Sequence, residues 1–181
     1  MGRPLGPYHR PVAIRSINEG PGRPLGPMAV RSTLASHTPA AIRAVLGGLP
    51  TATGYRVTVK PLRYRTRPHL VAFTFWDSAE MLIQVPEPFR AFRELVDLGT
   101  RGFPLVPFRT RREVIRFLYL HEFCHYWLFL THGWGTSAEV QCDRYAFANY
   151  RKRGTVAPPR VRRGERIRER PVALSARGRG A

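Results

Sequence analysis

The sequence predicts an α+β fold in which a small, mostly antiparallel sheet precedes two helices. Three short runs between residues 55 and 85 are rich in Val, Ile, Thr and aromatic residues, a composition typical of β-strands. Residues 112–130 then form a long apolar stretch without Pro or Gly, and a second helical pattern begins at residue 139. The expected order is therefore a short helix, the sheet, a long buried helix and a final helix.

The middle of the chain, residues 33–150, is expected to form a single domain, because a total of 181 residues corresponds to one domain by length. Residues 1–32 contain the segment Gly-Arg-Pro-Leu-Gly-Pro twice, and this Pro/Gly/Arg-rich composition predicts a flexible tail. The tail holds no apolar run of the kind found in secretory signal peptides, and Met28 offers a second start for translation. We therefore expect a cytoplasmic protein without a membrane partner.

The end of the chain, residues 151–181, is expected to be a disordered basic tail. It contains eleven Lys or Arg residues and two Glu residues, and so carries nine units of the formal net charge of +18. Such a charge favours binding to nucleic acid through counterion release, without recognition of a base sequence. The alternative is a solvated tail that has no partner, because net charge determines association and not fold.

A short helix is expected at residues 39–46. Thr38 is a favourable N-cap residue, and Pro39 is favourable in the first turn of a helix. Gly47 and Gly48 follow and predict the end of this helix.

Strands are expected next at residues 55–60, 70–76 and 81–85. A short turn at residues 77–79 joins the second strand to the third, which indicates a largely antiparallel sheet. An edge strand of this sheet could hold an extended peptide through backbone hydrogen bonds.

Between the sheet and the long helix, residues 89–96 are expected to form one or two helical turns, and the proline-spaced residues 103–108 a connection. The long helix that follows is apolar on almost every face, which is typical of a helix buried in a core. His and Glu side chains are rare in such a helix unless they are paired or bind a metal ion.

The long helix carries the sequence His-Glu-x-x-His at residues 121–125. Residues four apart lie on one face of a helix, so His121 and His125 can both direct an imidazole at one zinc ion, with Glu122 beside them. A catalytic zinc ion needs a third protein ligand and an open position for water. The third ligand must come from further along the chain.

Two residues compete for the place of third ligand. Glu139 is preferred, because it begins the final helix after a glycine-containing turn and has Asp143 one helical turn further on. Such a pair can give one carboxylate to the metal and the second to a ligating imidazole. His132 is the alternative metal ligand, although the motif with a third histidine at fixed spacing needs Gly and His where this chain has Leu128 and Thr131.

Together with residues 138–148, the His-Glu-x-x-His motif resembles the ImmA/IrrE family of minimal gluzincin peptidases. In this family a Glu-x-x-Ala-Asp/Asn-Arg-Phe-Ala-Ala pattern follows on the next helix. The resemblance implies a minimal zincin-like domain with His121, His125 and Glu139 as zinc ligands and Glu122 as the general base. It also implies peptide hydrolysis, often of DNA-binding repressors. The chain departs from the family pattern where Cys and Tyr replace the usual Ala and Phe, at Cys142 and Tyr145.

The predicted function is therefore a zinc-dependent metallopeptidase acting on a protein or peptide substrate, with Glu122 moving the proton of the attacking water. A donor to the developing oxyanion is also required, and Tyr126, His132 and Tyr145 are all candidates. The alternative function is a non-catalytic, zinc-stabilised module that binds nucleic acid through its basic tails. The chain has two cysteines, Cys124 in the expected long helix and Cys142 in the expected final helix. Two cysteines in such a chain do not suggest a disulfide framework.

Overall fold

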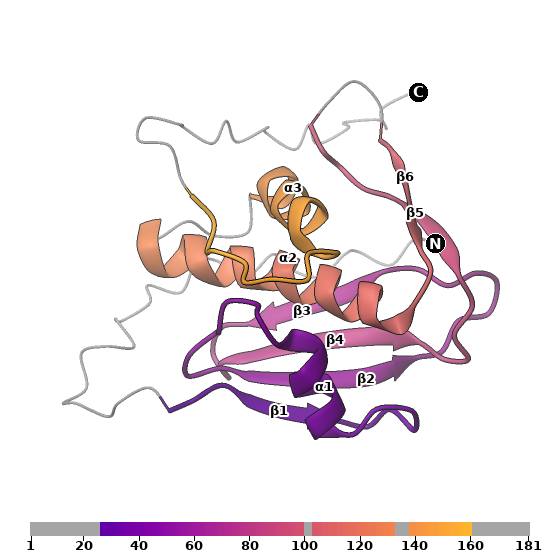
Figure 1. The fold of residues 1–181 in the computed structure, drawn as a ribbon, viewed down its shortest axis with the longest axis horizontal. Helices are drawn as coiled ribbons and strands as arrows, with labels where there is room; N and C mark the ends of the chain where they lie inside the picture. The colour runs from indigo at the N-terminus through magenta and orange to yellow at the C-terminus, as the bar shows by residue number, and fades with distance from the viewer. Residues whose placement is uncertain (1–25, 100–102, 133–137, 161–181) are drawn as a thin grey trace, which may run out of the picture.

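The computed structural model describes residues 26–99, 103–132 and 138–160, and over these residues the predicted α+β fold is confirmed. The helices of this part of the chain are α1 (Pro39–Leu46), α2 (Arg111–His132) and α3 (Glu139–Asn149). A four-stranded sheet forms one layer, with α1 and α2 on one of its faces and α3 on the side of α2 away from the sheet (Figure 1). The hydrophobic core lies between the sheet and α2.

The four-stranded sheet is mixed and contains, in spatial order, β1 (Ala29–Ser32), β2 (Arg56–Leu62), β4 (Glu80–Pro86) and β3 (Val71–Phe75). β1 is parallel to β2 and β2 is parallel to β4, whereas β3 and β4 are antiparallel. The expectation of a mostly antiparallel sheet is therefore wrong. The chain crosses from β1 to β2 through α1, and such a crossover joins parallel strands. β3 then takes the edge position, so that β2 and β4 pair directly.

The short helix and the three expected strands are confirmed. Thr38 caps α1 through its side-chain oxygen, which accepts a hydrogen bond from the Ala41 N–H at 3.2 Å. The central strands β2 and β4 direct fully buried aliphatic side chains at the helices. These side chains are Val57, Val59, Met81, Ile83 and Val85.

The folded part of the chain extends into both of the segments expected to be tails. β1 (Ala29–Ser32) lies inside the expected flexible tail of residues 1–32, yet it pairs with β2. At the other end, Val156 is 3% exposed, and its backbone N–H donates to the Gly48 carbonyl at 2.8 Å. The ordered domain therefore extends beyond residues 33–150 on both sides. The remaining parts of the two expected tails, residues 1–25 and 161–181, lie outside the described residues.

The segment expected to be a helical turn contains a strand instead. β5 (Phe92–Leu95) pairs in antiparallel orientation with β6 (Leu105–Phe108), which lies in the expected connection. The Phe92 and Phe108 rings stack with centroids 5.4 Å apart, and Phe108 is fully buried. Packing of these aromatic rings, a contact between distant residues, stabilises the ribbon where local sequence allowed a helix.

α2 is a core helix, as its composition predicts, and residues 114–120 are all buried. Arg116 is the charged exception. Its guanidinium donates to the backbone carbonyls of Val45, Tyr150 and Lys152 at 2.9, 2.8 and 2.7 Å, which joins α2 to the ends of α1 and α3. A search of the described helices finds none with the length and hydrophobicity needed to cross a membrane.

Candidate metal centre

His121 and His125 lie one turn apart on α2, where their imidazole rings meet edge to face, with centroids 4.8 Å apart. Their Nε2 atoms are 3.1 Å apart, and both side chains are largely buried. Because α2 is embedded in the core, the surrounding residues restrict how far the two rings can move. The helix thus presents two nitrogen ligands to one point, as the spacing of the motif predicts.

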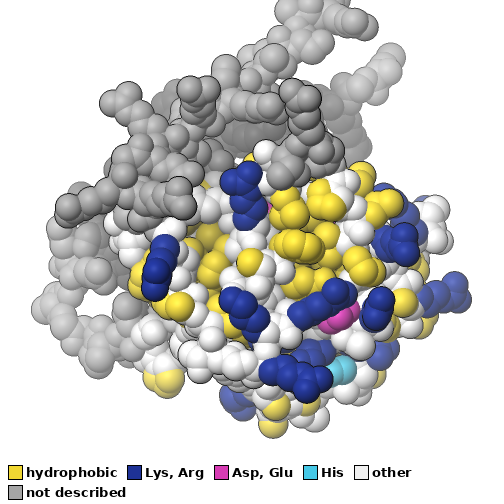
Figure 2. All heavy atoms as spheres, turned by 45° about the horizontal axis from the view of Figure 1, so that its top comes forward, with side chains coloured by type: hydrophobic (Ala, Val, Ile, Leu, Met, Phe, Trp, Pro, Cys, Tyr) yellow, Lys and Arg dark blue, Asp and Glu magenta, His cyan; other side chains and the backbone are white. Residues whose placement is uncertain are grey.

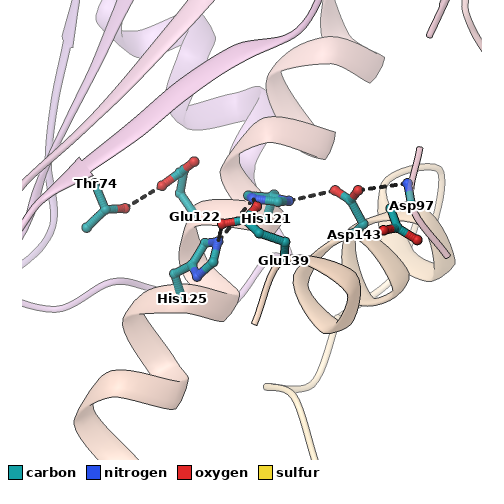
Figure 3. Close-up of polar contacts among 7 residues, drawn as sticks. All are labelled: Thr74, Asp97, His121, Glu122, His125, Glu139 and Asp143. Atoms are coloured by element: carbon teal, nitrogen blue, oxygen red, sulfur yellow. Dashed lines mark hydrogen bonds and ion pairs between the residues drawn. The ribbon is translucent and has the colours of Figure 1, made fainter. Parts of the chain in front are cut away.

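Glu139 reaches the same point from the first residue of α3. Its carboxylate oxygens lie 3.2 Å from His121 Nε2 and 3.3 Å from His125 Nε2, and the three side chains form a cluster in the centre of Figure 3. Ligand atoms at zinc distances of about 2.0–2.1 Å in a tetrahedron are about 3.3 Å apart. The two Nε2 atoms are 3.1 Å apart, and each lies near a different oxygen of Glu139, His121 near Oε2 at 3.2 Å and His125 near Oε1 at 3.3 Å. Two imidazole nitrogens and a carboxylate are ligand types that suit a zinc ion, and the cluster is compact enough to hold a metal ion.

Asp143 lies one helical turn beyond Glu139, and both of its carboxylate oxygens are used. Oδ1 is 2.8 Å from His121 Nδ1, and Oδ2 accepts the backbone N–H of Asp97 at 3.0 Å (Figure 3). The first contact leaves Nε2 of His121 directed at the metal centre, which is how a carboxylate orients a metal-binding histidine. The second joins α3 to the segment after β5, so the carboxylate cannot rotate freely.

Glu122 points away from the three candidate ligands and towards the sheet. It is 5% exposed, and its Oε2 accepts a hydrogen bond of 2.6 Å from the hydroxyl of Thr74 on β3 (Figure 3). Burial raises the pKa of Glu122, more than the positive charge of His121 and the Thr74 hydrogen bond lower it. A buried carboxylate with a raised pKa, adjacent in sequence to a candidate metal ligand, suits a group that accepts and returns a proton.

The charges of the cluster depend on one another. Burial lowers the pKa of His121, but hydrogen bonds with Asp143 and Glu139 outweigh this effect and raise the pKa to about 10. Burial raises the pKa of Glu139, but hydrogen bonds with the two histidines outweigh this effect and lower the pKa overall. Without a metal ion, the cluster is therefore stabilised by an imidazolium–carboxylate pair. A zinc ion would take over the role of the positive charge.

Of the two candidate third ligands, Glu139 is placed at the centre. His132 is the last residue of α2, so the chain does not fold back before it, and its side chain lies outside the described residues. A helix rises about 1.5 Å per residue, which separates the backbone of His132 from that of His125 by about 10 Å along the axis. The group His121, His125 and Glu139 is the one set of three potential ligands found among the described residues.

The hydroxyls of Tyr126 and Tyr145, two of the three candidate oxyanion donors, are already engaged. Tyr126 donates to the Thr53 carbonyl at 3.1 Å, and Tyr145 donates to the Ala157 carbonyl at 2.8 Å. Each phenol has one proton to donate, so neither is free to stabilise an oxyanion in this conformation. The third candidate is His132, whose side chain lies outside the described part of the structure.

Both cysteines are buried free thiols between α2 and α3, packed with Leu128 and Ala138. Such burial is usual for Cys residues without a disulfide, which behave as small apolar side chains. Neither belongs to the group of potential metal ligands.

Sequence reasoning missed two residues that contact the site. Thr74 is on β3, 48 residues before its partner Glu122, and Asp97 contributes a backbone N–H from the segment after β5. Neither residue belongs to a motif, and only the packing of the sheet and the β5–β6 ribbon against the helices brings them to the site. No protein-family model matches the chain, and comparisons with curated proteins and with solved structures find no match either.

Proposed function

We propose that this protein is a zinc-dependent metallopeptidase that hydrolyses peptide bonds in a protein substrate. In this proposal His121, His125 and Glu139 bind the metal ion, and Asp143 orients His121. The observation that carries the proposal is the convergence of two Nε2 atoms and one carboxylate, with contacts of 3.1 to 3.3 Å between them. The resemblance to the ImmA/IrrE peptidases supports the same ligand set.

Glu122 is the proposed general base. A zinc ion at this centre would supply Lewis-acid activation of a water molecule and of the scissile carbonyl. Glu122 takes the proton of that water and passes it to the leaving amine, for which its buried position and raised pKa are suited. Thr74 holds the carboxylate in one orientation through the hydrogen bond to Oε2.

β3 is the proposed binding edge for the substrate backbone. It is the outermost strand next to β4, and it carries Thr74, which contacts Glu122. An extended peptide can add to such an edge through main-chain hydrogen bonds. A peptide bound there would lie alongside the helix that carries the proposed catalytic residues.

The competing function, an inert zinc-stabilised module that binds nucleic acid, fits the site less well. Structural zinc sites are closed by four protein ligands, whereas catalytic sites have three and an open position. Among the described residues, the group offers three ligands, and Glu122 lies beside them without belonging to the set. A structural site has no need for such a buried carboxylate.

The proposal extends to the substrate class and to the location of the enzyme. The resemblance favours a regulatory protein bound to DNA as the substrate, and the basic ends of the chain would help the enzyme reach it. We place the enzyme in the cytoplasm because both cysteines are free thiols, as is usual in reducing compartments.

The decisive experiment compares the wild type with Glu122→Gln. Both proteins are purified, loaded with zinc and incubated with a mixture of unfolded proteins, and new peptide termini are identified by mass spectrometry. The wild type should cleave, a chelator should stop cleavage, and Glu122→Gln should keep its zinc but lose about a hundredfold or more in rate. Glu87→Gln, the same change at a position away from the site, serves as the control.

Two results would contradict the proposal. Cleavage that survives both Glu122→Gln and the chelator would come from a contaminating protease. A zinc-loaded wild type that cleaves no substrate would favour the binding module instead.

A further inference from the structure

A pocket of about 350 Å³ opens directly beside the metal centre. His121, Glu122 and Asp143 form part of its wall, and the rest of the wall comes from the region around β3, from β5 and from α2. The apolar residues of that wall are Leu70, Ala72, Leu95, Val96, Phe117 and Leu118. The volume is within the range of about 300–1,000 Å³ that is usual for ligand pockets. A side chain adjacent to the scissile bond could therefore enter it.

One charged residue in this wall, Glu94, has no role in the proposed chemistry. Its Oε2 atom is buried and has no hydrogen-bond partner among the described residues. Its Oε1 atom lies 4.0 Å from Arg67 Nη2, at the limit of an ion pair, and the Arg67 side chain is 72% exposed. A carboxylate oxygen that is buried without a partner is costly. A bound cation in the pocket would remove that cost.

We propose that this pocket binds a long, positively charged side chain of the substrate, Arg or Lys, next to the scissile bond. The inference rests on the proposed peptidase function and names its specificity. The aliphatic part of such a side chain would contact the apolar wall, and its charged end would pair with Glu94. A neutral aliphatic side chain would fill the same space but leave Oε2 unpaired, and an acidic side chain would be repelled.

The charge distribution of the molecule supports a cationic occupant. The chain has twelve Asp and Glu residues and thirty Lys and Arg residues. On the face shown in Figure 2, Lys and Arg side chains surround hydrophobic surface and acidic side chains are rare. The metal centre and pocket are the exception, because five acidic residues gather there: Glu94, Asp97, Glu122, Glu139 and Asp143. Four of these are used by the metal centre or the segments around it, which leaves Glu94 for the substrate.

The test uses three peptides that are identical except at one position, which holds Arg, norleucine or Glu. Cleavage of each by the zinc-loaded full-length protein is followed by mass spectrometry, which also locates the cleaved bond. Glu94→Gln removes the charge without changing the size of the side chain, and Glu87→Gln is the matched control. Binding is measured separately, by fluorescence anisotropy of the same labelled peptides with zinc-loaded Glu122→Gln, alone and combined with either substitution.

The wild type should cleave the Arg peptide at least about tenfold faster than the norleucine peptide, because a charge-assisted hydrogen bond is absent in the second case. Glu94→Gln should reduce that ratio by about the same factor, whereas Glu87→Gln should not change it. Binding to Glu122→Gln should follow the same order, with the Glu peptide weakest. Arg67→Gln, which removes the competing cation, should increase the preference for Arg.

An equal ratio in the wild type and Glu94→Gln, or a preference for norleucine, would overturn the pocket assignment and leave the peptidase proposal standing. Failure of the wild type to cleave any of the peptides would count against the peptidase proposal. In that case the anisotropy measurement still decides the pocket. Equal affinities of the Arg and norleucine peptides would reject it, and an Arg preference that depends on Glu94 would retain it as a binding site.

Discussion

The hydroxyl of Thr74 donates a 2.6 Å hydrogen bond to Oε2 of Glu122, across the interface between the sheet and α2. A strand at the edge of the sheet thus fixes the proposed general base. The strand that would bind the substrate backbone is therefore also the one that orients the carboxylate. A shift of β3 relative to α2 would disturb both functions at once.

Replacing Thr74 by Val should reduce kcat by about tenfold, since a hydrogen bond to a charged group contributes about 1.5–3 kcal/mol. The hydrogen bond lowers the pKa of Glu122, so its loss should raise that pKa and move the acidic limb of the kcat/KM profile to higher pH. Thr74→Ser keeps the hydroxyl and should remain close to the wild type. Zinc content should be the same in all three proteins. A Val variant with the wild-type rate and pH profile would show that Thr74 has no part in catalysis.

The candidate site could be predicted from the sequence where its residues are close together in one helix. His121 and His125 lie one turn apart, and Glu139 and Asp143 are related in the same way on the next helix, so helical periodicity alone places each pair on one face. Contacts between distant segments could not be predicted in this way. Glu94 is an example, because its burial depends on how β5 packs beside α2.

The same distinction applies to the fold. Strands β2, β3 and β4 have strong local signals, and all three are confirmed. β1 has four residues, and its pairing with β2 depends on the crossover through α1 and not on local composition. Because the composition of residues 1–32 predicts a tail, the pairing of β1 with β2 could not be anticipated. The ribbon of β5 and β6 could not be predicted either, because it is stabilised by aromatic contacts between its two strands and not by local sequence.

Glu139→Ala should weaken zinc binding far more than His132→Ala, because the Glu139 carboxylate contacts both Nε2 atoms. Asp143→Ala should have an intermediate effect of about ten- to a hundredfold, as is typical of residues that orient a ligating histidine. Competition with a chromophoric chelator would measure the three affinities. If His132→Ala loses more zinc affinity than Glu139→Ala, then His132 and not Glu139 is the third ligand.

Zinc binding should release about one proton per molecule in the neutral pH range. The pKa of His121 rises from 6.5 to about 10 in the metal-free protein, so the ring is protonated between these values and must lose that proton to bind zinc. The apparent affinity should therefore increase as the pH rises towards about 10. Glu139 contributes no proton, because its pKa is lowered.

Calorimetry in buffers of different ionisation enthalpy would count these protons. Asp143→Asn removes the carboxylate that raises the pKa of His121, so it should release fewer protons in the same pH range. Proton release that is absent from the wild type, or unchanged by Asp143→Asn, would contradict the assignment of an imidazolium at His121.

Two deletions at the C-terminal end, of different lengths, should have different effects on stability and on nucleic-acid binding. Residues 151–160 belong to the folded domain, because Arg116 donates to the Lys152 carbonyl at 2.7 Å and Val156 is buried. Removing residues 151–181 should therefore lower the free energy of unfolding by about 2 kcal/mol or more, as it leaves a buried guanidinium with fewer acceptors and removes a buried Val. Removing residues 161–181 alone should leave that free energy unchanged. Urea denaturation of the two shortened proteins would measure the difference.

The shorter deletion isolates the charge effect. Residues 161–181 contain seven Arg and two Glu residues, so their removal should weaken binding to a duplex of random sequence. It should also reduce the slope of log affinity against log salt by about 0.9 for every phosphate that these arginines neutralise. Cleavage of a short unstructured peptide should not change, because the residues of the candidate metal centre and Thr74 lie within residues 74–143. A duplex affinity and salt slope equal to those of the full chain would mean that these arginines contribute nothing to nucleic-acid binding.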